Sequence, residues 1–282
     1  MTEPESDLAT RAAASQALAF HALHGPGRLL VLANAWDAGS ARLIEACGAE
    51  AIATTSAGLA WSRGHPDGNA LPPPVLARAV AEIARVVSVP LSVDAEGGYS
   101  ADPAAVGETI AAVLDGGAVG VNLEDGGDPP ELLCAKIDAA KTAAERAGVD
   151  LFVNARTDVY LRGLVPPERA VEETVARVRR YADAGADGAF VPRLAAPDAI
   201  RSVASEISLP LNVLVVPGLA PIAELRPLGV RRVSAGSAIA QASYAVARRA
   251  ATQLLEEGRY EALYERIADY GEMNRLFRAE RA

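Results

Sequence analysis

The stretch LSVDAEGGYSADPAAVGETIAAVLDGGAVGVNLEDGG, residues 91–127, contains one complete unit of the fold. It opens with a short apolar run, Leu91–Val93, and ends around a second run, Val119–Leu123. Runs this short and apolar on both faces are typical of buried parallel strands. Between them, apolar residues at positions 106, 110, 113 and 114 have the spacing of a helix that buries one face. The stretch therefore predicts a strand, a covering helix and a second, parallel strand.

The same unit recurs along the chain. Phrases such as DGGAVGV and DAGADGAF precede several apolar runs, and their glycines suit the left-handed residue that closes a helix. Eight evenly spaced units favour a closed (β/α)8 TIM barrel over an open, doubly wound sheet. The eight predicted strands are residues 29–33, 51–55, 91–93, 119–123, 151–154, 188–191, 211–215 and 232–234.

The pattern predicts a single domain over residues 1–282. Its barrel core covers about residues 29–257, and a helix at about residues 7–24 precedes it. A C-terminal extension at about residues 258–282 carries further helical sequence at about residues 259–278. The length is normal for one barrel of this kind.

Composition excludes several classes of function. The 282 residues include 27 Lys and Arg against 36 Asp and Glu, a net charge of −9, so neither nucleic acid nor an anionic membrane is expected as a partner. Two distant cysteines, Cys47 and Cys134, do not form a disulfide framework, and residues 1–8 lack the pattern of a signal peptide. No apolar run approaches the roughly 20 residues of a membrane span. We expect a cytoplasmic protein that acts on a small molecule.

Carboxylates follow two neighbouring strands of the predicted barrel. Asp94 and Glu96 end the third strand two residues apart, so their side chains point the same way. Glu124 ends the fourth strand, next to Asp125. The active site of such a barrel lies at the carboxyl ends of its strands, where converging carboxylates repel one another unless a divalent cation lies among them. We predict a Mg²⁺ site, with Mn²⁺ as an alternative, at Asp94, Glu96 and Glu124. The competing interpretation is that these acids cap helices or pair with arginine.

Two further charged residues follow strands. Arg156, at the end of the fifth strand, has a planar fork that binds a carboxylate with two hydrogen bonds. The competing role for Arg156 is a salt bridge to Asp158 or to the acid cluster. Asp67 lies in a Gly- and Pro-rich loop after the second strand, a composition that suits a mobile lid. There it would hydrogen-bond a metal-bound water.

Small residues come directly after the second strand, at Ser56, Gly58 and Leu59. Side chains of this size let backbone N–H groups approach an oxyanion. Taken alone, this signal is weak.

Three motifs, SVDAEGGYS, GVNLEDGG and VNARTDVYLRG, resemble in this order those of the isocitrate lyase/phosphoenolpyruvate mutase superfamily, especially its phosphonomutase-like and 2-methylisocitrate lyase-like members. The resemblance runs from about residue 29 to about residue 260. It implies Mg²⁺ held by Asp94, Glu96 and Glu124, partly through water. It also implies that Arg156 grips the substrate carboxylate and that Asp67 bridges through water.

The resemblance implies further contacts and an assembly. The segment Ala57–Leu59, after Ser56, is similar to the family's backbone oxyanion cradle, and Asn212 matches a polar position on the seventh strand. Members share an enolate that the metal stabilises. They tend to form tetramers that exchange the C-terminal helix, so we expect a homo-oligomer, either a dimer or a tetramer.

Departures from the family pattern bear on the reaction. Glu96 stands where the family usually has Asp, and it is longer by one methylene. The Lys-Lys/Arg-Cys-Gly-His motif of the lyase branch is absent, and Cys134 has the apolar neighbours of a buried helix face. The mutase branch holds a phosphoryl group with a Lys/Asn/Ser-bearing loop, whereas residues 125–130 contain no cation. Asp125 and Asp128 would repel that group, and Arg193 offers one compensating charge.

We therefore predict a Mg²⁺-dependent lyase or decarboxylase that breaks a C–C bond of a small 2-oxo or 2-hydroxy carboxylate through a metal-stabilised enolate. The first competing function is a phosphoenolpyruvate mutase-like phosphonomutase or another C–P bond enzyme, which an ordered cation near residues 125–130 would favour. A class II-type aldolase and a non-catalytic barrel that binds a metabolite are also compatible with the sequence.

Overall fold

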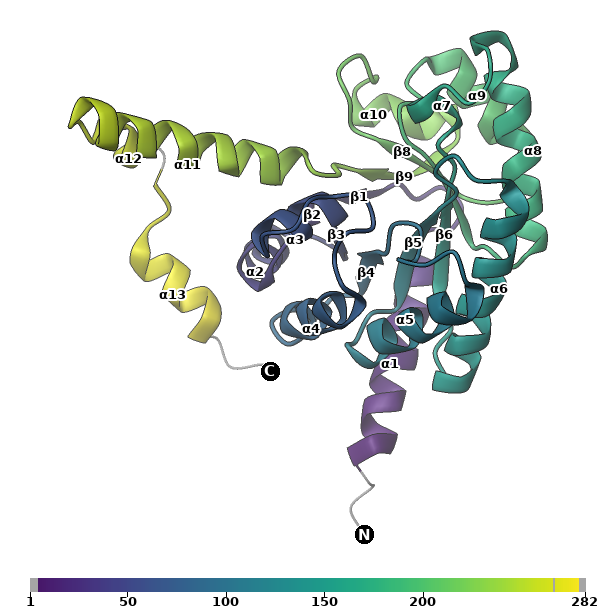
Figure 1. Ribbon diagram of the computed structural model, residues 1–282, viewed down its shortest axis with the longest axis horizontal. Helices are drawn as coiled ribbons and strands as arrows, with labels where there is room; N and C mark the ends of the chain where they lie inside the picture. The colour runs from purple at the N-terminus through teal and green to yellow at the C-terminus, as the bar shows by residue number, and fades with distance from the viewer. Residues whose placement is uncertain (1–4, 266, 279–282) are drawn as a thin grey trace.

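A closed barrel of parallel strands forms the centre of the molecule (Figure 1). The structure, a computed structural model, describes residues 5–265 and 267–278. Strands β1 and β2 are two pieces of one segment, and the barrel closes because β1 pairs with β9 while β2 pairs with β3. The strands are β1 (Leu30–Leu32), β2 (Asn34–Ala35), β3 (Ile52–Thr54), β4 (Leu91–Asp94), β5 (Gly120–Glu124), β6 (Phe152–Arg156), β7 (Gly188–Val191), β8 (Leu211–Leu214) and β9 (Val230–Ser234).

Helices cover the outside of this barrel. Helix α5 shows how the sequence builds them: Asp102 accepts a hydrogen bond from the Ala104 N–H, Pro103 occupies the first turn, and the predicted apolar face is buried. The helices are α1 (Glu5–Ala22), α2 (Ala38–Ala46), α3 (Ser56–Ser62), α4 (Pro73–Ala84), α5 (Pro103–Asp115), α6 (Pro130–Ala147), α7 (Val159–Arg162), α8 (Ala170–Asp183), α9 (Pro197–Glu206), α10 (Ile222–Leu225), α11 (Ala238–Glu257), α12 (Glu261–Tyr264) and α13 (Tyr270–Arg278), with 3₁₀ turns at Pro167–Arg169 and Arg226–Leu228.

Each of the eight predicted apolar runs overlaps a strand, and the predicted (β/α)8 barrel is confirmed. The interpretation of the runs as apolar on both faces was wrong. Buried asparagines meet inside the barrel, where Asn154 Nδ2 donates to Asn122 Oδ1 at 2.9 Å and to Asn212 Oδ1 at 3.0 Å. Because alternate residues of a strand face the same side, one polar residue per strand suffices to build this layer.

Helix α1 closes the end of the barrel at which the strands begin. Phe20 is fully buried and packs edge-on against Phe152, the first residue of β6, with ring centres 5.4 Å apart. A Cβ added at Gly120, the first residue of β5, would lie 2.6 Å from the Phe20 ring. The barrel floor is therefore an aromatic plug, and only glycine leaves room for it at that position of β5.

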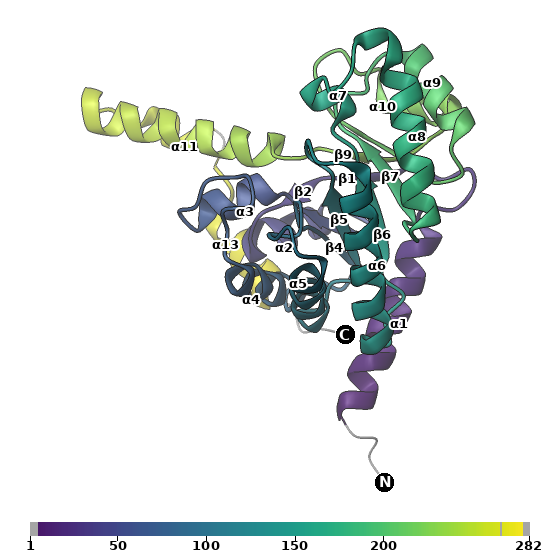
Figure 2. The same ribbon diagram turned by 45° about the vertical axis from the view of Figure 1, so that its right-hand side comes forward.

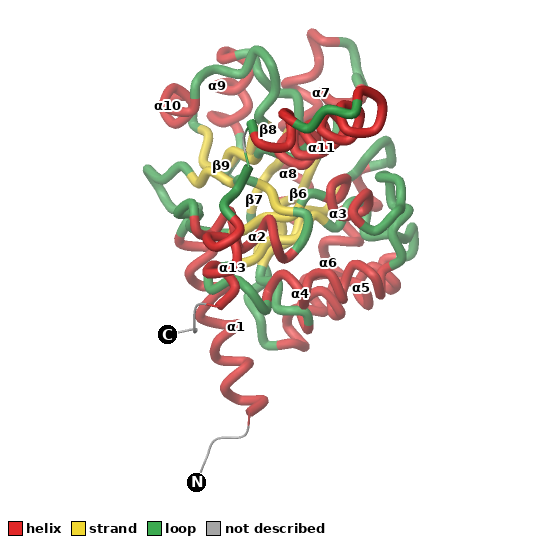
Figure 3. The backbone as a smooth tube through the Cα atoms, turned by 90° about the vertical axis from the view of Figure 1, so that its left-hand side faces the viewer, coloured by secondary structure: helices red, strands yellow, loops and turns green. Residues whose placement is uncertain are grey.

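The C-terminal helices leave the barrel. Figures 1 and 2 show α11 projecting away from it, while Figure 3 shows α13 returning beside α2. The Arg42 side chain, on α2, donates to the Leu276 carbonyl on α13 at 2.9 Å. Apolar side chains on these helices are exposed, including Tyr244, Leu255 and Tyr264. Within the described part of the chain, no helix has the length and apolarity needed to cross a membrane.

Candidate active site

The predicted acidic residues lie at the opposite end of the barrel from α1, where the strands end. Asp94 is the last residue of β4 and Glu124 the last residue of β5, and these strands are paired. Asp94 Oδ2 accepts a hydrogen bond from the Ser56 N–H at 3.2 Å, at the start of α3. The ends of β4 and β5 and the start of α3 therefore meet at the barrel mouth, as the sequence predicted.

Glu96 is directed toward the loop between α3 and α4. Its backbone has a φ of 49°, in the left-handed region that few residues other than glycine adopt. Its Oε2 accepts from the Gly68 N–H at 2.9 Å and also from the Asn69 N–H, while its Oε1 is buried without a hydrogen-bond partner among the described residues. Glu96 therefore ties down the loop that carries the exposed residue Asp67.

Arg156 forms ion pairs with two carboxylates. Its Nε and Nη2 donate to the two oxygens of Asp158 at 2.7 and 3.1 Å, and its Nη1 lies 2.6 Å from Glu124 Oε2. The salt bridge that competed with substrate binding as the role of Arg156 is thus present. Because Asp158 is fully buried and takes one edge of the guanidinium, the Nη1 edge remains as the one that faces Glu124 and the mouth.

The mouth carries an excess of negative charge. Burial raises the pKa of Glu124 to about 8; Arg156 opposes this rise, and the charges of Asp94, Asp158 and Glu96 add to it. Burial is also the main cause of the raised pKa of Glu96, with Asp94 and Asp67 contributing. Carboxylates in this environment are destabilised as anions until further positive charge arrives.

A preassembled metal cluster is not present in the part of the chain that the structure describes: no group of three His, Cys, Asp or Glu side chains is placed to hold an ion. The physical reason is that Glu124 pairs with Arg156 while Glu96 bonds the 68–69 backbone. The donor chemistry nevertheless fits a hard cation, because the donors are carboxylate oxygens and the buried Glu96 Oε1 has no partner among the described residues.

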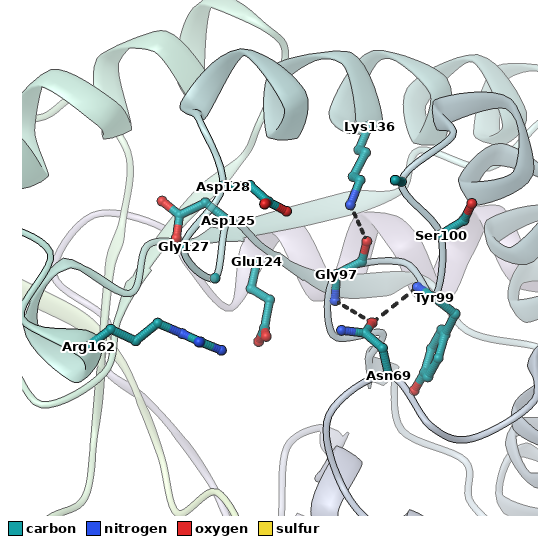
Figure 4. A pocket seen from close by; sticks show the side chains of 12 residues that line it. Asn69, Gly97, Tyr99, Ser100, Glu124, Asp125, Gly127, Asp128, Lys136 and Arg162 are labelled. Carbon is teal, nitrogen blue, oxygen red and sulfur yellow. Dashed lines mark hydrogen bonds between the residues drawn. The ribbon is translucent and has the colours of Figure 1, made fainter.

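A cavity of about 350 Å³ opens beside these acids, between the loops that follow β4 and β5 (Figure 4). Glu124 lines it, and two cations, Lys136 and Arg162, approach from either side. Lys136 is buried on α6 and its Nζ donates to the Gly97 carbonyl at 2.7 Å. Residues 125–130 themselves contain no cation, but neighbouring helices bring cations to them.

Sequence reasoning missed both cations, although signals for them existed. Lys136 stands beside Ile137 on a helix face that Leu133 also occupies, and a lysine on an apolar face is seldom there without a partner. Arg162 lies within the motif VNARTDVYLRG, six residues after Arg156. Arg193, which the sequence offered as a compensating charge, is exposed and does not line this cavity.

The remaining predicted contacts occupy different positions. Ser56 and the segment Ala57–Leu59 form the first turn of α3. The Ser56 N–H donates to Asp94 and the Leu59 N–H to the Thr55 carbonyl, which leaves the N–H groups of Ala57 and Gly58 without an acceptor among the described residues. Asn212 lies deeper, fully buried in the polar layer, where its Nδ2 donates to the Val213 carbonyl and to Ser234 Oγ. Cys134 is partly buried on α6, with its thiol 3.6 Å from the Arg180 carbonyl.

Comparison with known proteins assigns the family. The sequence profile of the family described as phosphoenolpyruvate phosphomutase matches residues 20–255. This chain belongs to that family, within the isocitrate lyase/phosphoenolpyruvate mutase superfamily. The profile spans the whole barrel, from the end of α1 to α11.

Individual relatives differ in their named reactions. An uncharacterized protein of Mycobacterium tuberculosis is 40% identical over 266 residues, which cover 90% of this chain and 97% of the relative. An oxaloacetate decarboxylase of Paraburkholderia xenovorans is 30% identical over 224 residues, covering 74% and 71%. A phosphonopyruvate hydrolase crystallised with oxalate and Mg²⁺ has a TM-score of 0.79 and 26% identity, covering 93% and 94%. Membership of the phosphoenolpyruvate phosphomutase family therefore leaves the reaction open.

Proposed function

We propose that this protein is a Mg²⁺-dependent lyase or decarboxylase that breaks a C–C bond of a small 2-oxo or 2-hydroxy carboxylate. The observation that carries the proposal is the placement of Arg156 against Glu124 at the mouth, next to Asp94. An arginine edge and carboxylates side by side suit a substrate carboxylate and a hard cation, respectively.

Asp94, Glu96 and Glu124 would hold the Mg²⁺ ion, or Mn²⁺, some of them through water. The bound cation would supply positive charge beside the oxygens on which negative charge develops as the bond breaks. Support comes from the oxygen-only donor set and from the raised pKa of Glu124, which is caused mainly by burial and increased by the charges of Asp94, Asp158 and Glu96. The phosphonopyruvate hydrolase crystallised with oxalate and Mg²⁺ is a relative whose ligands are of the same kind.

Arg156 would bind the substrate carboxylate with its Nη1 edge once Glu124 no longer occupies it. Asp158 keeps the guanidinium oriented from the opposite edge. The free N–H groups at Ala57 and Gly58 would face the developing oxyanion, and Asp67 would bridge to the site through water. Asn212 would support the substrate site indirectly, through its hydrogen bond to Asn154 in the buried polar layer of the barrel.

One observation favours a second candidate, a phosphonomutase or a different C–P bond enzyme. The ordered cations Lys136 and Arg162 line the cavity beside residues 125–130, where a phosphoryl group would need positive charge. We rank it second because no lysine lies on the loop itself.

A panel of 2-oxo and 2-hydroxy acids, with 3-phosphonopyruvate included, tests the proposal. We expect proton NMR to show that a C–C bond of one of these acids is broken in the presence of Mg²⁺ and that none is broken in EDTA. Phosphorus NMR showing conversion of the phosphonate alone would establish the second candidate. Arg156→Lys should lower kcat/KM of whichever reaction is seen by about 10³-fold. If no acid is turned over, the protein is a barrel that binds a metabolite without catalysis.

We also propose a homo-oligomer, a dimer or a tetramer, in which α11 and α12 cover a neighbouring copy. The support is the apolar surface that these helices expose away from their own barrel, including Val246, Leu255 and Tyr264. Light scattering of the full chain and of Leu255→Glu should show an assembly that the variant weakens. A monomeric wild-type protein would contradict this proposal.

A further inference from the structure

Arg162 has a guanidinium group that its neighbours use only in part. Its Nε donates to Asp158 Oδ2 at 3.0 Å, and its side chain is 54% exposed. Neither Nη atom has a hydrogen-bond partner within the described residues. A Cβ added at Gly126 would lie 3.8 Å from Nη2, so the free end of the group reaches over the loop after β5 (Figure 4).

That loop presents unused donors of its own. Gly126 has a φ of 57°, and nothing would lie within 4 Å of a Cβ at Gly127. Neither glycine N–H donates a hydrogen bond to any described residue. Backbone N–H groups exposed in a turn of this kind, with no side chain to cover them, attract anions.

The carboxylate nearest to this loop in sequence does not oppose an anion. Asp125 is fully buried and accepts from the Asp158 N–H at 2.9 Å, from Arg177 Nη1 at 2.9 Å and from the Tyr181 hydroxyl at 2.7 Å. The repulsion that the sequence suggested for Asp125 is thus removed by its partners. Asp128 interacts with the positive charge of Lys136, which also lines the cavity.

Two arginines share the buried carboxylate of Asp158. Arg156 also pairs with Glu124, whereas Arg162 has no second carboxylate partner among the described residues. Arg156 approaches Glu124 from one side of the mouth, and Arg162 reaches the loop after β5. Two arginine groups fixed to one carboxylate define two anion positions on the same wall of the site.

We propose that Arg162, together with the N–H groups of Gly126 and Gly127, binds a second anionic group of the substrate. The substrate of the proposed reaction is then a dianion: one carboxylate binds Arg156, and a carboxylate or phosphonate farther along the molecule binds Arg162. Arg162 is the residue that selects such acids over monocarboxylates. This inference rests on the proposed function and adds the substrate class to it.

Three 2-hydroxy acids that share one head group test the inference: lactate, malate and 3-phosphonolactate. Their dissociation constants are measured by competition against oxalate in Mg²⁺, for wild type, Arg162→Gln, Arg162→Lys and the control Arg201→Gln. Arg201 is a half-exposed arginine of α9, far along the chain, paired only with Asp198 among the described residues. Circular dichroism confirms that each variant is folded.

We expect wild type and Arg201→Gln to prefer malate or 3-phosphonolactate to lactate by about tenfold or more, the range of a hydrogen bond between charged groups. Arg162→Gln should remove this preference, and Arg162→Lys should keep part of it. Which of the two dianions binds more tightly assigns the second group as carboxylate or phosphonate.

A wild-type protein without any preference, or a preference that survives in Arg162→Gln, overturns the inference while oxalate binding keeps the proposed function intact. Failure of wild type to bind oxalate in Mg²⁺ overturns the proposed function itself. The two failures are therefore distinguishable in one set of titrations.

Discussion

The two ends of the barrel differ in the side chains that they bury: aromatic rings at the floor and charged groups at the mouth. At the floor, Phe20 of α1 and His24, in the turn after α1, are buried against Phe152, with the His24 ring stacked on Phe152 at 4.0 Å between centres. At the mouth, the paired side chains of Glu124 and Arg156 are 12% and 17% exposed, and Glu124 lines a cavity. The floor is closed by aromatic packing, whereas the mouth keeps charges that neighbouring carboxylates destabilise.

The fate of the buried charges shows the difference. At the floor, burial lowers the pKa of His24 to about 3, with the Arg232 charge adding to the effect, so the ring is neutral at ordinary pH. At the mouth, burial and like charges raise the pKa of Glu124 to about 8. At the floor the His24 ring is thus neutral beside the buried charge of Arg232, while at the mouth the charge of Glu124 depends on what binds.

The largest expected effect concerns the mouth. Arg156→Lys keeps the charge but loses the fork that engages Asp158 and a carboxylate together, so kcat/KM should fall by about 10³-fold. The melting temperature of the variant checks that it is folded. Activity within tenfold of wild type would mean that Arg156 serves the ion pairs alone.

Phe20→Ala moves the test to the floor. Removing a fully buried aromatic ring should lower the free energy of unfolding by about 3–5 kcal/mol, measured in urea. At a temperature where the variant is folded, its turnover per folded molecule should match wild type. A loss of turnover per folded molecule would show that packing at the floor also controls activity at the mouth.

Gly120→Ala should cost about 1–3 kcal/mol, because the new methyl group meets the Phe20 ring and lies 3.2 Å from Ser92 Oγ. In a double-mutant cycle with Phe20→Ala the cost at Gly120 should shrink, since the ring is gone. If the losses in unfolding free energy from the two substitutions simply add, the Phe20 ring is not the cause of the cost at Gly120.

His24 gives the floor a pH dependence. Its folded pKa, about 3, lies below its unfolded value of 6.5, so below pH 6.5 the unfolded chain binds a proton that the folded chain does not. Stability should therefore fall by about 1.4 kcal/mol per pH unit as the pH drops from 6.5 toward 3. The slope is measured against His24→Gln, which should lack it, and equal slopes would assign the effect to different groups.

The sequence predicted the barrel and the mouth residues because both follow from local patterns. Strand runs and helix periodicity place each strand end, and Asp94, Glu124 and Arg156 follow directly. It offered Asp158 and the acid cluster as partners of Arg156, both of which the structure shows, but it did not predict the partners of Glu96. Glu96 reaches Gly68 and Asn69 across the mouth, a contact set by loop geometry rather than by spacing.

The missed features share a physical cause. Lys136 and Arg162 reach the cavity from α6 and α7, so their place depends on how the helices pack on the barrel. The polar layer escaped notice because a single asparagine in a run of valine and leucine barely alters its apolar pattern. Asn122 and Asn154 face each other across the paired strands β5 and β6, whereas Asn212 reaches Asn154 from β8 only once the sheet curves into a barrel.

Calorimetric titration of oxalate, which mimics the enolate of pyruvate, tests the central claim most directly. The titration is run in Mg²⁺ and in EDTA, with wild type, Glu124→Gln and the control Glu131→Gln, an exposed acid of α6. The account predicts that wild type and the control bind oxalate in Mg²⁺ only, and that Glu124→Gln binds at least about tenfold more weakly. Equal binding in Mg²⁺ and EDTA, or no binding in either, would contradict it.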